Sequence, residues 1–528
     1  MTDMEYDVQF YTDAVKLFRE KIIEMEAQGY LIDLLDDFVK DPKNKYSIIP
    51  PMLSVGEGEK GGAVSSYNEA LLEREKLIKS STTDNPLSEI ANNQVDKLRQ
   101  GVVQSISNMK KSYQLAGYTL HVIPSKKFKN ITMSLKLEGK LTKENVTKRS
   151  LLAFMLTGGT ENYPSTQALS THLEDLYGMS FGTNLATKGI GQVLNISSVC
   201  INETFLPYQE NLLVQQIKMF NDVLFHPNVR NGKFDEQTFA IKKKELKERL
   251  IVQNDDKFMY GLDQLFRNMG EGGFLSISNN GYVEELDRIT NEEVYKYLVE
   301  CLENDVKHLY VVGDVDESIV DVFKENLSFS SSSQPLDPVT NFKSSKNDIL
   351  EVVEKQDITQ AKLNMGYVVD CNFKDPGTYA MTVFNAIFGG FSQSRLFKIV
   401  REKHSLCYYI SSSYGAFSGI MTVNAGIEGS DYQKAKDLIA QELKNIQNGD
   451  FSNDEIDLAK LMLKSSLTKT KDEPISLITL AYNRDLTGVQ ETNDEYLEKL
   501  MRVSKEEIIA ASKKVHLDTI FLLTGSDK

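Results

Sequence analysis

The sequence predicts an α+β protein in which two similar α+β domains follow one another, preceded by an all-helical hairpin. Three observations support this fold class. Roughly the first 112 of the 528 residues space their apolar side chains as helices do, the rest alternates short strand-like and long helical segments, and three local motifs occur twice in the same order. A chain of this length also needs several domains, at about 100–200 residues each.

Residues 1–112 are expected to form the helical hairpin. Apolar residues between Val8 and Phe38 recur at three- and four-residue steps, the period of one helix face. Asp41-Pro42 ends this segment, because proline disfavours helical geometry in the residue before it. A second helix is predicted around Leu71–Ile78, and Asn85-Pro86 opens a third as its cap and first-turn proline.

The remainder of the chain mixes strands and helices. Tyr118–Pro124 and Ile131–Leu137 are rich in the apolar and β-branched residues of strands. Thr290–Glu293 and Ser504–Glu507 have the spacing of a capping box, and each is followed by a helical segment, a short apolar strand and a glycine.

Two further motifs also occur twice. Lysine-rich helices are predicted to begin near Phe234 and near Phe451, and a Gly-Gly pair ends both Phe154–Gly159 and Phe384–Gly390. Each Gly-Gly pair predicts a tight turn in which glycine permits a positive φ.

This repeat predicts two duplicated domains. They are assigned to residues 113–327 and 348–528. Residues 328–347 contain a run of serines and two prolines, which predicts an extended, solvated linker between them.

Composition excludes several classes of partner. With 60 Lys and Arg against 75 Asp and Glu, the formal charge of -15 provides no positive field for nucleic acid or an anionic membrane. We find neither a signal-peptide pattern at the start nor an apolar run of about 18 residues. The four cysteines are far apart, which fits a reducing compartment. We therefore expect a cytoplasmic protein that binds neither nucleic acid nor membrane.

The C-terminal half carries a specific succession of motifs. Phe388–Phe397 reads Phe-Gly-Gly-Phe-Ser-Gln-Ser-Arg-Leu-Phe, and Val400–Tyr408 reads Val-Arg-Glu-Lys-His-Ser-Leu-Cys-Tyr. This succession resembles the C-terminal domain of insulinase/pitrilysin-type (inverzincin) peptidases. The resemblance covers roughly residues 113–528 and implies paired, homologous α+β domains.

The zinc motif of catalytic members is degenerate here. Those members carry H-x-x-E-H, two zinc-binding histidines with a glutamate base between them, and a third ligand on a later helix. The corresponding positions hold Ser150, Ala153 and Phe154. Neither Ser nor Phe replaces imidazole on zinc, and Ala accepts no proton. We expect no catalytic residue and no metal in this chain.

Glu248 lies at about the position of the third zinc ligand. One carboxylate makes no tetrahedral site, so a solvated helix-face glutamate is the preferred interpretation. The six histidines include no pair at helical spacing, and each is interpreted as a surface or packing residue.

Arg401 and Tyr408 match the Arg/Tyr pair with which active relatives hold the substrate backbone near zinc. Arg offers a fork of donors for a carbonyl or carboxylate, and a phenol donates to a developing oxyanion. The alternative is that Arg401 pairs with an acidic neighbour and Tyr408 fills the core. Some relatives divide labour between two chains, of which one lacks H-x-x-E-H and keeps this pair. Among them the sequence is most similar to the Firmicutes proteins associated with elongation-factor-P 5-aminopentanol modification, which are paired with a zinc-bearing subunit.

The resemblance therefore implies a catalytically inactive, substrate-holding subunit of a heteromeric zinc peptidase. Its expected partners are an unfolded peptide and a zinc-bearing H-x-x-E-H chain of the same family, with zinc in that partner and a homodimer possible without it. Two alternatives remain open. One is a pseudoenzyme scaffold or binding protein without a proteolytic role, and the other is an autonomous zinc peptidase with an unrecognised site.

Residues 1–112 lie outside this resemblance. Tyr46–Pro51, Tyr67–Glu75 and Asn85–Leu98 are similar to the periplasmic helical region of Bacteroidetes polysaccharide chain-length-determinant proteins and their tyrosine kinases. The membrane spans and P-loop of those proteins do not occur in this sequence. The combination indicates a fusion, with Met109 as a native start of the second part.

Overall fold

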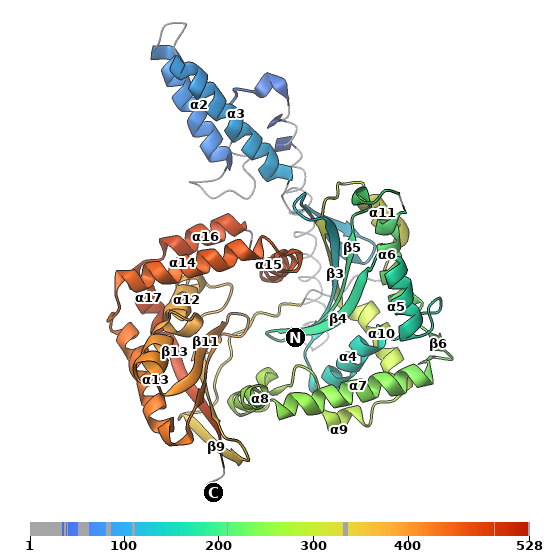
Figure 1. Cartoon of the computed structure of the whole chain (residues 1–528), viewed down its shortest axis with the longest axis vertical. Coiled ribbons are helices and arrows are strands. Elements are labelled where there is room, and N and C mark those ends of the chain that lie inside the picture. The colour runs from blue at the N-terminus through green and yellow to red at the C-terminus, as the bar shows by residue number, and fades with distance from the viewer. Residues whose placement is uncertain are drawn as a thin grey trace, which may run out of the picture.

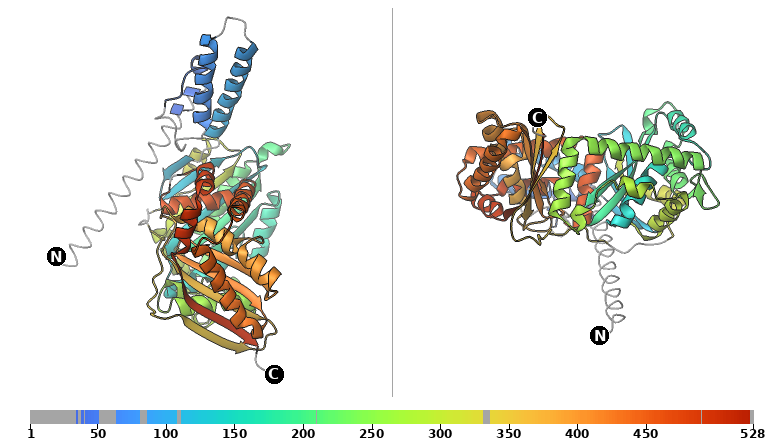
Figure 2. Two further views of the ribbon diagram at one scale, coloured as in Figure 1. Left: turned by 90° about the vertical axis from the view of Figure 1, so that its left-hand side faces the viewer. Right: turned by 90° about the horizontal axis from the view of Figure 1, so that it is seen from below.

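The computed structural model describes residues 34–35, 38–39, 41–50, 63–80, 86–107, 111–208, 210–330, 336–489 and 491–525 (Figure 1). The helix expected between Val8 and Phe38 lies almost wholly outside the described residues. Helices α2 (Ala63–Ser80) and α3 (Pro86–Ser107) form the expected hairpin and enclose a small core around Tyr67, Leu71 and Val95. Figure 2 shows this hairpin projecting beyond the body formed by the two sheets.

The first sheet has six strands in the order β1-β2-β8-β3-β5-β4. The strands span Lys111–Leu115 (β1), Tyr118–Pro124 (β2), Asn130–Lys140 (β3), Ser180–Lys188 (β4), Gly191–Ile201 (β5) and Val306–Gly313 (β8). β6 (Val229–Arg230) and β7 (Lys233–Phe234) form a separate short pair. The second sheet has five strands in the order β11-β12-β10-β13-β9. They span Leu350–Gln356 (β9), Ala361–Val369 (β10), Cys407–Gly415 (β11), Ile420–Ile427 (β12) and Val515–Gly525 (β13).

The two sheets share one topology. β3 pairs antiparallel with β5 and β8, and β10 pairs antiparallel with β12 and β13. The pairs β2–β8 and β9–β13 are both parallel. Because strand order and direction agree, the repeat found in the sequence is a duplicated α+β domain, and the predicted fold class is confirmed.

Helices cover one face of each sheet and bury a separate core there. On the first sheet they are α4 (Lys143–Met155), α5 (Thr166–Asp175), α6 (Leu212–Phe225), α7 (Glu236–Asp255), α9 (Val283–Leu286), α10 (Asn291–Asn304) and α11 (Ile319–Asn326). On the second they are α12 (Thr378–Asn385), α13 (Tyr432–Gln447), α14 (Asn453–Thr470), α16 (Asn493–Arg502) and α17 (Lys505–Ser512), with π-helical turns η5 (Ala386–Gly390) and η6 (Phe397–Lys403). The capping boxes expected at α10 and α17 are both present.

The domains are joined by a reciprocal exchange of helices. α8 (Lys257–Met269) follows α7 but packs on β10 and β13 of the second sheet, where Leu265 contacts Phe521. α15 (Pro474–Thr487) follows α14 but packs on β3 and β8 of the first sheet, where Ile478 contacts Val312. The second face of each sheet is therefore covered by the other domain.

The described part of the linker is extended as expected but only partly solvated. Asp337, Lys343 and Ser345 are exposed, whereas Pro338 and Phe342 are buried. The Pro338 carbonyl accepts a hydrogen bond from the Ile190 amide at 3.1 Å, and the Phe342 amide donates to the Ser418 carbonyl at 2.7 Å. The linker thus bonds to the β4–β5 turn of one domain and the β11–β12 turn of the other, which removes its backbone from water.

The two Gly-Gly pairs differ. Gly159 has φ 137°, as the turn prediction required. Gly389 and Gly390 lie in η5 without a positive φ, so that prediction is wrong for this pair. A β-carbon on Gly389 would stand 2.8 Å from the Ser412 amide nitrogen, so glycine is needed here because η5 packs closely against β11.

Among the described residues, we find no helix with the length and apolar character needed to cross a bilayer.

Candidate functional site

Helix α4 carries the three degenerate zinc positions. Ser150 and Ala153 are only 2% and 4% exposed, and Phe154 packs against the first core. The Ser150 hydroxyl has no hydrogen-bond partner among the residues that the structure describes. Across from α4, the guanidinium carbon of Arg249 on α7 lies 5.7 Å from the centre of the Phe154 ring. A buried hydroxyl, a methyl group and a phenyl ring beside a cation do not fit a zinc ion, which takes imidazole, thiolate or carboxylate ligands.

Glu248 does not face this position. Its side chain is 63% exposed and pairs with Lys244 at 3.7 Å along the surface of α7. Arg249, one residue further on and thus about 100° around the helix, is the side chain that α7 presents to Phe154. In the part of the chain that the structure describes, no three His, Cys, Asp or Glu side chains are grouped so as to hold a metal ion.

Arg401 lies on η6, at the surface of the second domain. Its guanidinium carbon stands 4.5 Å from the centre of the Phe397 ring, which holds the long side chain by a cation–π contact. The side chain is exposed, and among the described residues no carboxylate pairs with it. The Ser405 amide donates to the Arg401 carbonyl at 3.1 Å, and Ser405 adopts φ 53°, which ends η6 and turns the chain into β11.

Tyr408 is the extra residue of a β-bulge. Cys407 pairs with Ile427, and Tyr409 pairs with Gly426, so Tyr408 has no partner of its own on β12. A bulge redirects a side chain out of the regular alternation, and Tyr408 is 60% exposed although it lies in a strand. Because β11 is an edge strand, the tyrosine lies at the border of the second sheet.

Glu428 is a member of this site that the sequence did not reveal. It follows β12, and its Oε1 accepts a hydrogen bond from the Tyr408 hydroxyl at 3.0 Å. This hydrogen bond raises the pKa of Tyr408 above its ordinary value. The sequence does not show this contact directly, because it depends on how β11 pairs with β12. That pairing places the residue after β12 beside Tyr408.

A second group of polar residues lies buried between the domains. His121 on β2 and His308 on β8 approach to 2.9 Å between Nε2 and Nδ1, and His121 stacks on Tyr310 with 4.3 Å between ring centres. The Tyr310 hydroxyl donates to Asp485 of α15 at 2.5 Å. From the sequence we interpreted each of these histidines separately, because their proximity follows only from the parallel pairing of β2 with β8.

Two charged residues of β3 face the same contact. β3 alternates apolar and polar residues, and α15 covers its polar face, so Lys136 and Glu138 are buried. Burial raises the pKa of Glu138 to about 8. Burial, and to a smaller extent the positive charge of the nearby Lys188, lowers the pKa of Lys136 to about 8. Tyr482 of α15 lies beside Glu138, yet neither its hydroxyl nor Glu138 Oε1 makes a hydrogen bond of ordinary geometry.

The fold and the α4 position together define a homologue of zinc peptidases whose metal-binding residues are replaced. The family model for the peptidase M16 inactive domain matches residues 288–463. The probable inactive metalloprotease YmfF of Bacillus subtilis is 34% identical over 412 residues, which cover 78% of this chain and 96% of that protein. The chain therefore belongs to the M16 peptidase family, as the resemblance to insulinase/pitrilysin-type peptidases implied.

Other relatives agree with this assignment. An uncharacterized zinc protease of B. subtilis, YmxG, is 21% identical over 383 residues, covering 70% of this chain and 91% of its own. A conserved protein from Enterococcus faecalis V583 has a crystal structure that aligns with a TM-score of 0.75 at 33% identity, over 80% of this chain and 100% of that one. A protease from Helicobacter pylori shares the fold, with a TM-score of 0.66 at 16% identity over 79% of this chain and 100% of that one.

Proposed function

We propose that this chain is the substrate-holding, non-catalytic subunit of a two-chain zinc peptidase. The observation that carries the proposal is a contrast between two sites. The positions that would bind zinc on α4 are filled by side chains that pack, whereas Arg401 and Tyr408 are exposed on the second domain, where another molecule can reach them.

Each of the two side chains has a definable role in this proposal. Arg401 presents its guanidinium to a backbone carbonyl or a C-terminal carboxylate of the peptide. When peptide binds, the single Tyr408 O–H turns from Glu428 to a carbonyl oxygen of the peptide near the partner's zinc, where negative charge develops. Glu428 is a positioning residue, because it orients the phenol through the 3.0 Å hydrogen bond before peptide arrives.

The partner is a zinc-bearing chain of the same family with an intact H-x-x-E-H motif. No step of hydrolysis is assigned to this chain, since α4 supplies neither a metal ligand nor a base. Such a pair requires an extensive interface, on the order of 1,600 Å² or more of buried surface.

The test is peptide hydrolysis by the co-purified pair. Arg401→Ala and Tyr408→Phe are each expected to lower kcat/KM by about tenfold or more, since each removes a hydrogen bond to a peptide oxygen that carries or develops negative charge. Lys403→Ala is the matched control, because Lys403 is an exposed cation on η6 that is not part of the Arg401/Tyr408 pair. Unchanged hydrolysis by both variants refutes the substrate-holding role and favours a scaffold without proteolytic function.

A further inference from the structure

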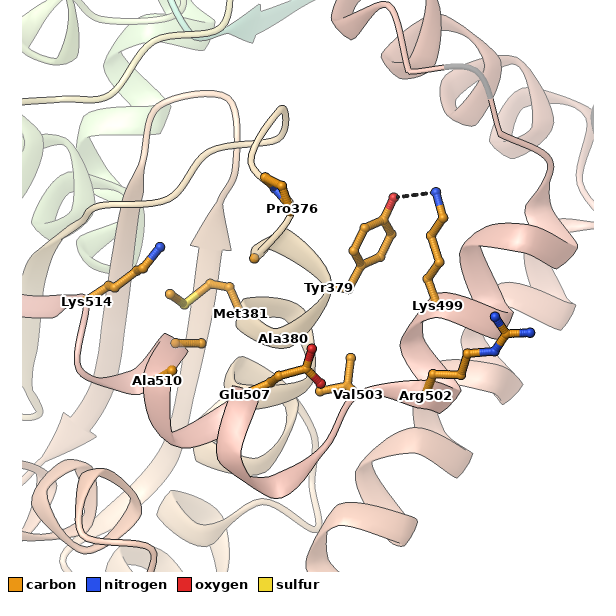
Figure 3. A pocket seen from close by; sticks show the side chains of 12 residues that line it. Pro376, Tyr379, Ala380, Met381, Lys499, Arg502, Val503, Glu507, Ala510 and Lys514 are labelled. Atoms are coloured by element: carbon orange, nitrogen blue, oxygen red, sulfur yellow. Dashed lines mark hydrogen bonds between the residues drawn. The ribbon is translucent and has the colours of Figure 1, made fainter. Parts of the chain in front are cut away.

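The second domain contains a pocket of about 410 Å³ between α12, α16 and α17, far along the chain from the degenerate zinc positions. Its apolar wall comes from α12, α17 and Val503 between α16 and α17, and its cations come from α16 and from the turn between α17 and β13 (Figure 3). The residues that matter most are Tyr379, Met381, Val503, Ala511, Lys499 and Lys514.

The duplication explains why the pocket exists. Tyr297 and Ala511 each lie seven residues after the Thr or Ser that caps α10 or α17. Arg149 and Tyr379 each lie five residues before the phenylalanine of their Gly-Gly motif. In the first domain, Arg149 Nε donates to the Tyr297 hydroxyl at 3.1 Å, so large side chains fill this place. In the second domain, alanine replaces tyrosine and the space stays open.

The first domain also shows what chemistry this place accommodates. There the buried Arg149 guanidinium pairs with Asp305 at 2.7 Å, so the space holds a cation together with its own anion. In the second domain the chain supplies cations but lacks an anion for one of them. Lys514 is an exposed residue whose Nζ has no ion-pair or hydrogen-bond partner among the described residues, and this nitrogen stands 3.8 Å from the point where a β-carbon of Gly377 would lie.

The other charged residues of the pocket are already paired. Lys499 contacts Glu491 at 2.9 Å and the Tyr379 hydroxyl at 3.2 Å. Arg502 pairs with Glu498 at 3.1 Å, and the Glu507 carboxylate accepts the Ser504 amide at 2.7 Å in the capping box. Figure 3 shows Lys514 on the side of the pocket opposite the Tyr379–Lys499 pair. A ligand would therefore meet one unpaired ammonium group at one end and apolar wall beyond it.

We infer that this pocket binds a small amphiphilic carboxylate, with the carboxylate against Lys514 and an apolar body along Met381, Val503 and Ala511. The volume lies within the 300–1,000 Å³ typical of small-molecule sites. Two sources offer this chemistry, namely a free fatty or aromatic acid and the C-terminal residue of a peptide. The inference stands apart from the peptide-holding role, because neither Arg401 nor Tyr408 lines the pocket.

Calorimetric titration of the full chain tests the inference with four probes: octanoate, N-acetyl-phenylalanine, its amide, and N-acetyl-Ala-Ala-Phe with a free carboxylate. At least one carboxylate is expected to saturate with a Kd of about 1 mM or below, and the amide is expected to bind about tenfold more weakly than the acid. Octanoate binding alone identifies the free acid as the source, and preference for the peptide identifies the C-terminus.

Variants decide whether binding occurs in this pocket. Lys514→Gln is expected to weaken the carboxylate about tenfold and to remove its advantage over the amide, while Lys513→Gln, at an exposed lysine outside the pocket, leaves both unchanged. Ala511→Tyr, which copies Tyr297, is expected to abolish binding by filling the space. Absence of saturable binding by every carboxylate overturns the inference, and so does an equal effect of the two lysine variants.

Discussion

Replacement of Glu138 by glutamine tests the electrostatics of the domain contact. The Glu138 side chain is 1% exposed beneath α15, and burial raises its pKa from 4.5 to about 8. The folded protein therefore keeps a proton on this group through a range in which the unfolded chain has lost it. In that range the unfolded state binds fewer protons, so stability falls as pH rises.

The size of the effect follows from the same two pKa values. Between pH 4.5 and about 8, one group contributes a slope of up to about 1.4 kcal/mol per pH unit. From about pH 5.5 to about pH 7.5, the parent should lose up to about 2–3 kcal/mol through Glu138, and Glu138→Gln should lose none of it. Lys136 affects stability in a different pH range. Because its pKa is lowered in the folded state, stability rises with pH between about 8 and 10.5.

Urea denaturation measures the difference. The chain contains no tryptophan, so circular dichroism is the suitable signal. Glu144→Gln, at an exposed carboxylate on α4, is the matched control and should follow the parent at both pH values. If the midpoints of the parent and Glu138→Gln shift equally between the two pH values, Glu138 is not protonated in the folded state and the reasoning is refuted.

Two further predictions concern α4. A variant whose residues 150–154 read His-Leu-Leu-Glu-His is expected to bind no stoichiometric zinc by elemental analysis. Zinc binding should require the further substitution Arg249→Glu, which supplies the third ligand. If the variant binds zinc without Arg249→Glu and loses it with Glu248→Ala, Glu248 is the third ligand instead. Arg149→Met is expected to lower the free energy of unfolding by about 3–5 kcal/mol, because it removes the buried guanidinium that pairs with the buried Asp305 carboxylate. The double variant Arg149→Met/Asp305→Leu should recover much of this lost free energy of unfolding in urea denaturation. If it is as destabilised as the single variant, the explanation by the buried ion pair is contradicted.

The sequence predicted those parts of the fold that local chemistry specifies. The capping boxes at Thr290 and Ser504 and the apolar alternation of β3 are readable within a few residues. The exchange of α8 and α15 was not predicted, because an amphipathic pattern shows that a helix needs an apolar partner and not which sheet provides it. The buried state of Lys136 and Glu138 was missed for the same reason, since polar residues alternating on a strand ordinarily face water.

Prediction of the candidate site had a similar limit. The family resemblance pointed to Arg401 and Tyr408, but the bulge that exposes Tyr408 and the approach of Glu428 depend on pairing across the β11–β12 hairpin. Glu248 and Arg249 are adjacent in sequence, and only the packing of α7 on α4 determines which of them faces Phe154.

The two sites also differ in what they contribute to the fold. Two imidazoles and a carboxylate half-buried on α4 would need a metal ion to satisfy them, whereas Ala153 and Phe154 add apolar contacts to the first core without one. The side chains at Ser150, Ala153 and Phe154 therefore require no metal ion at this position. Tyr408 presents the opposite case, because an aromatic ring that is 60% exposed on a bulged edge strand buries little surface and stabilises the fold little. Packing thus accounts for Ala153 and Phe154 but not for Tyr408, for whose phenol we propose contact with a second molecule.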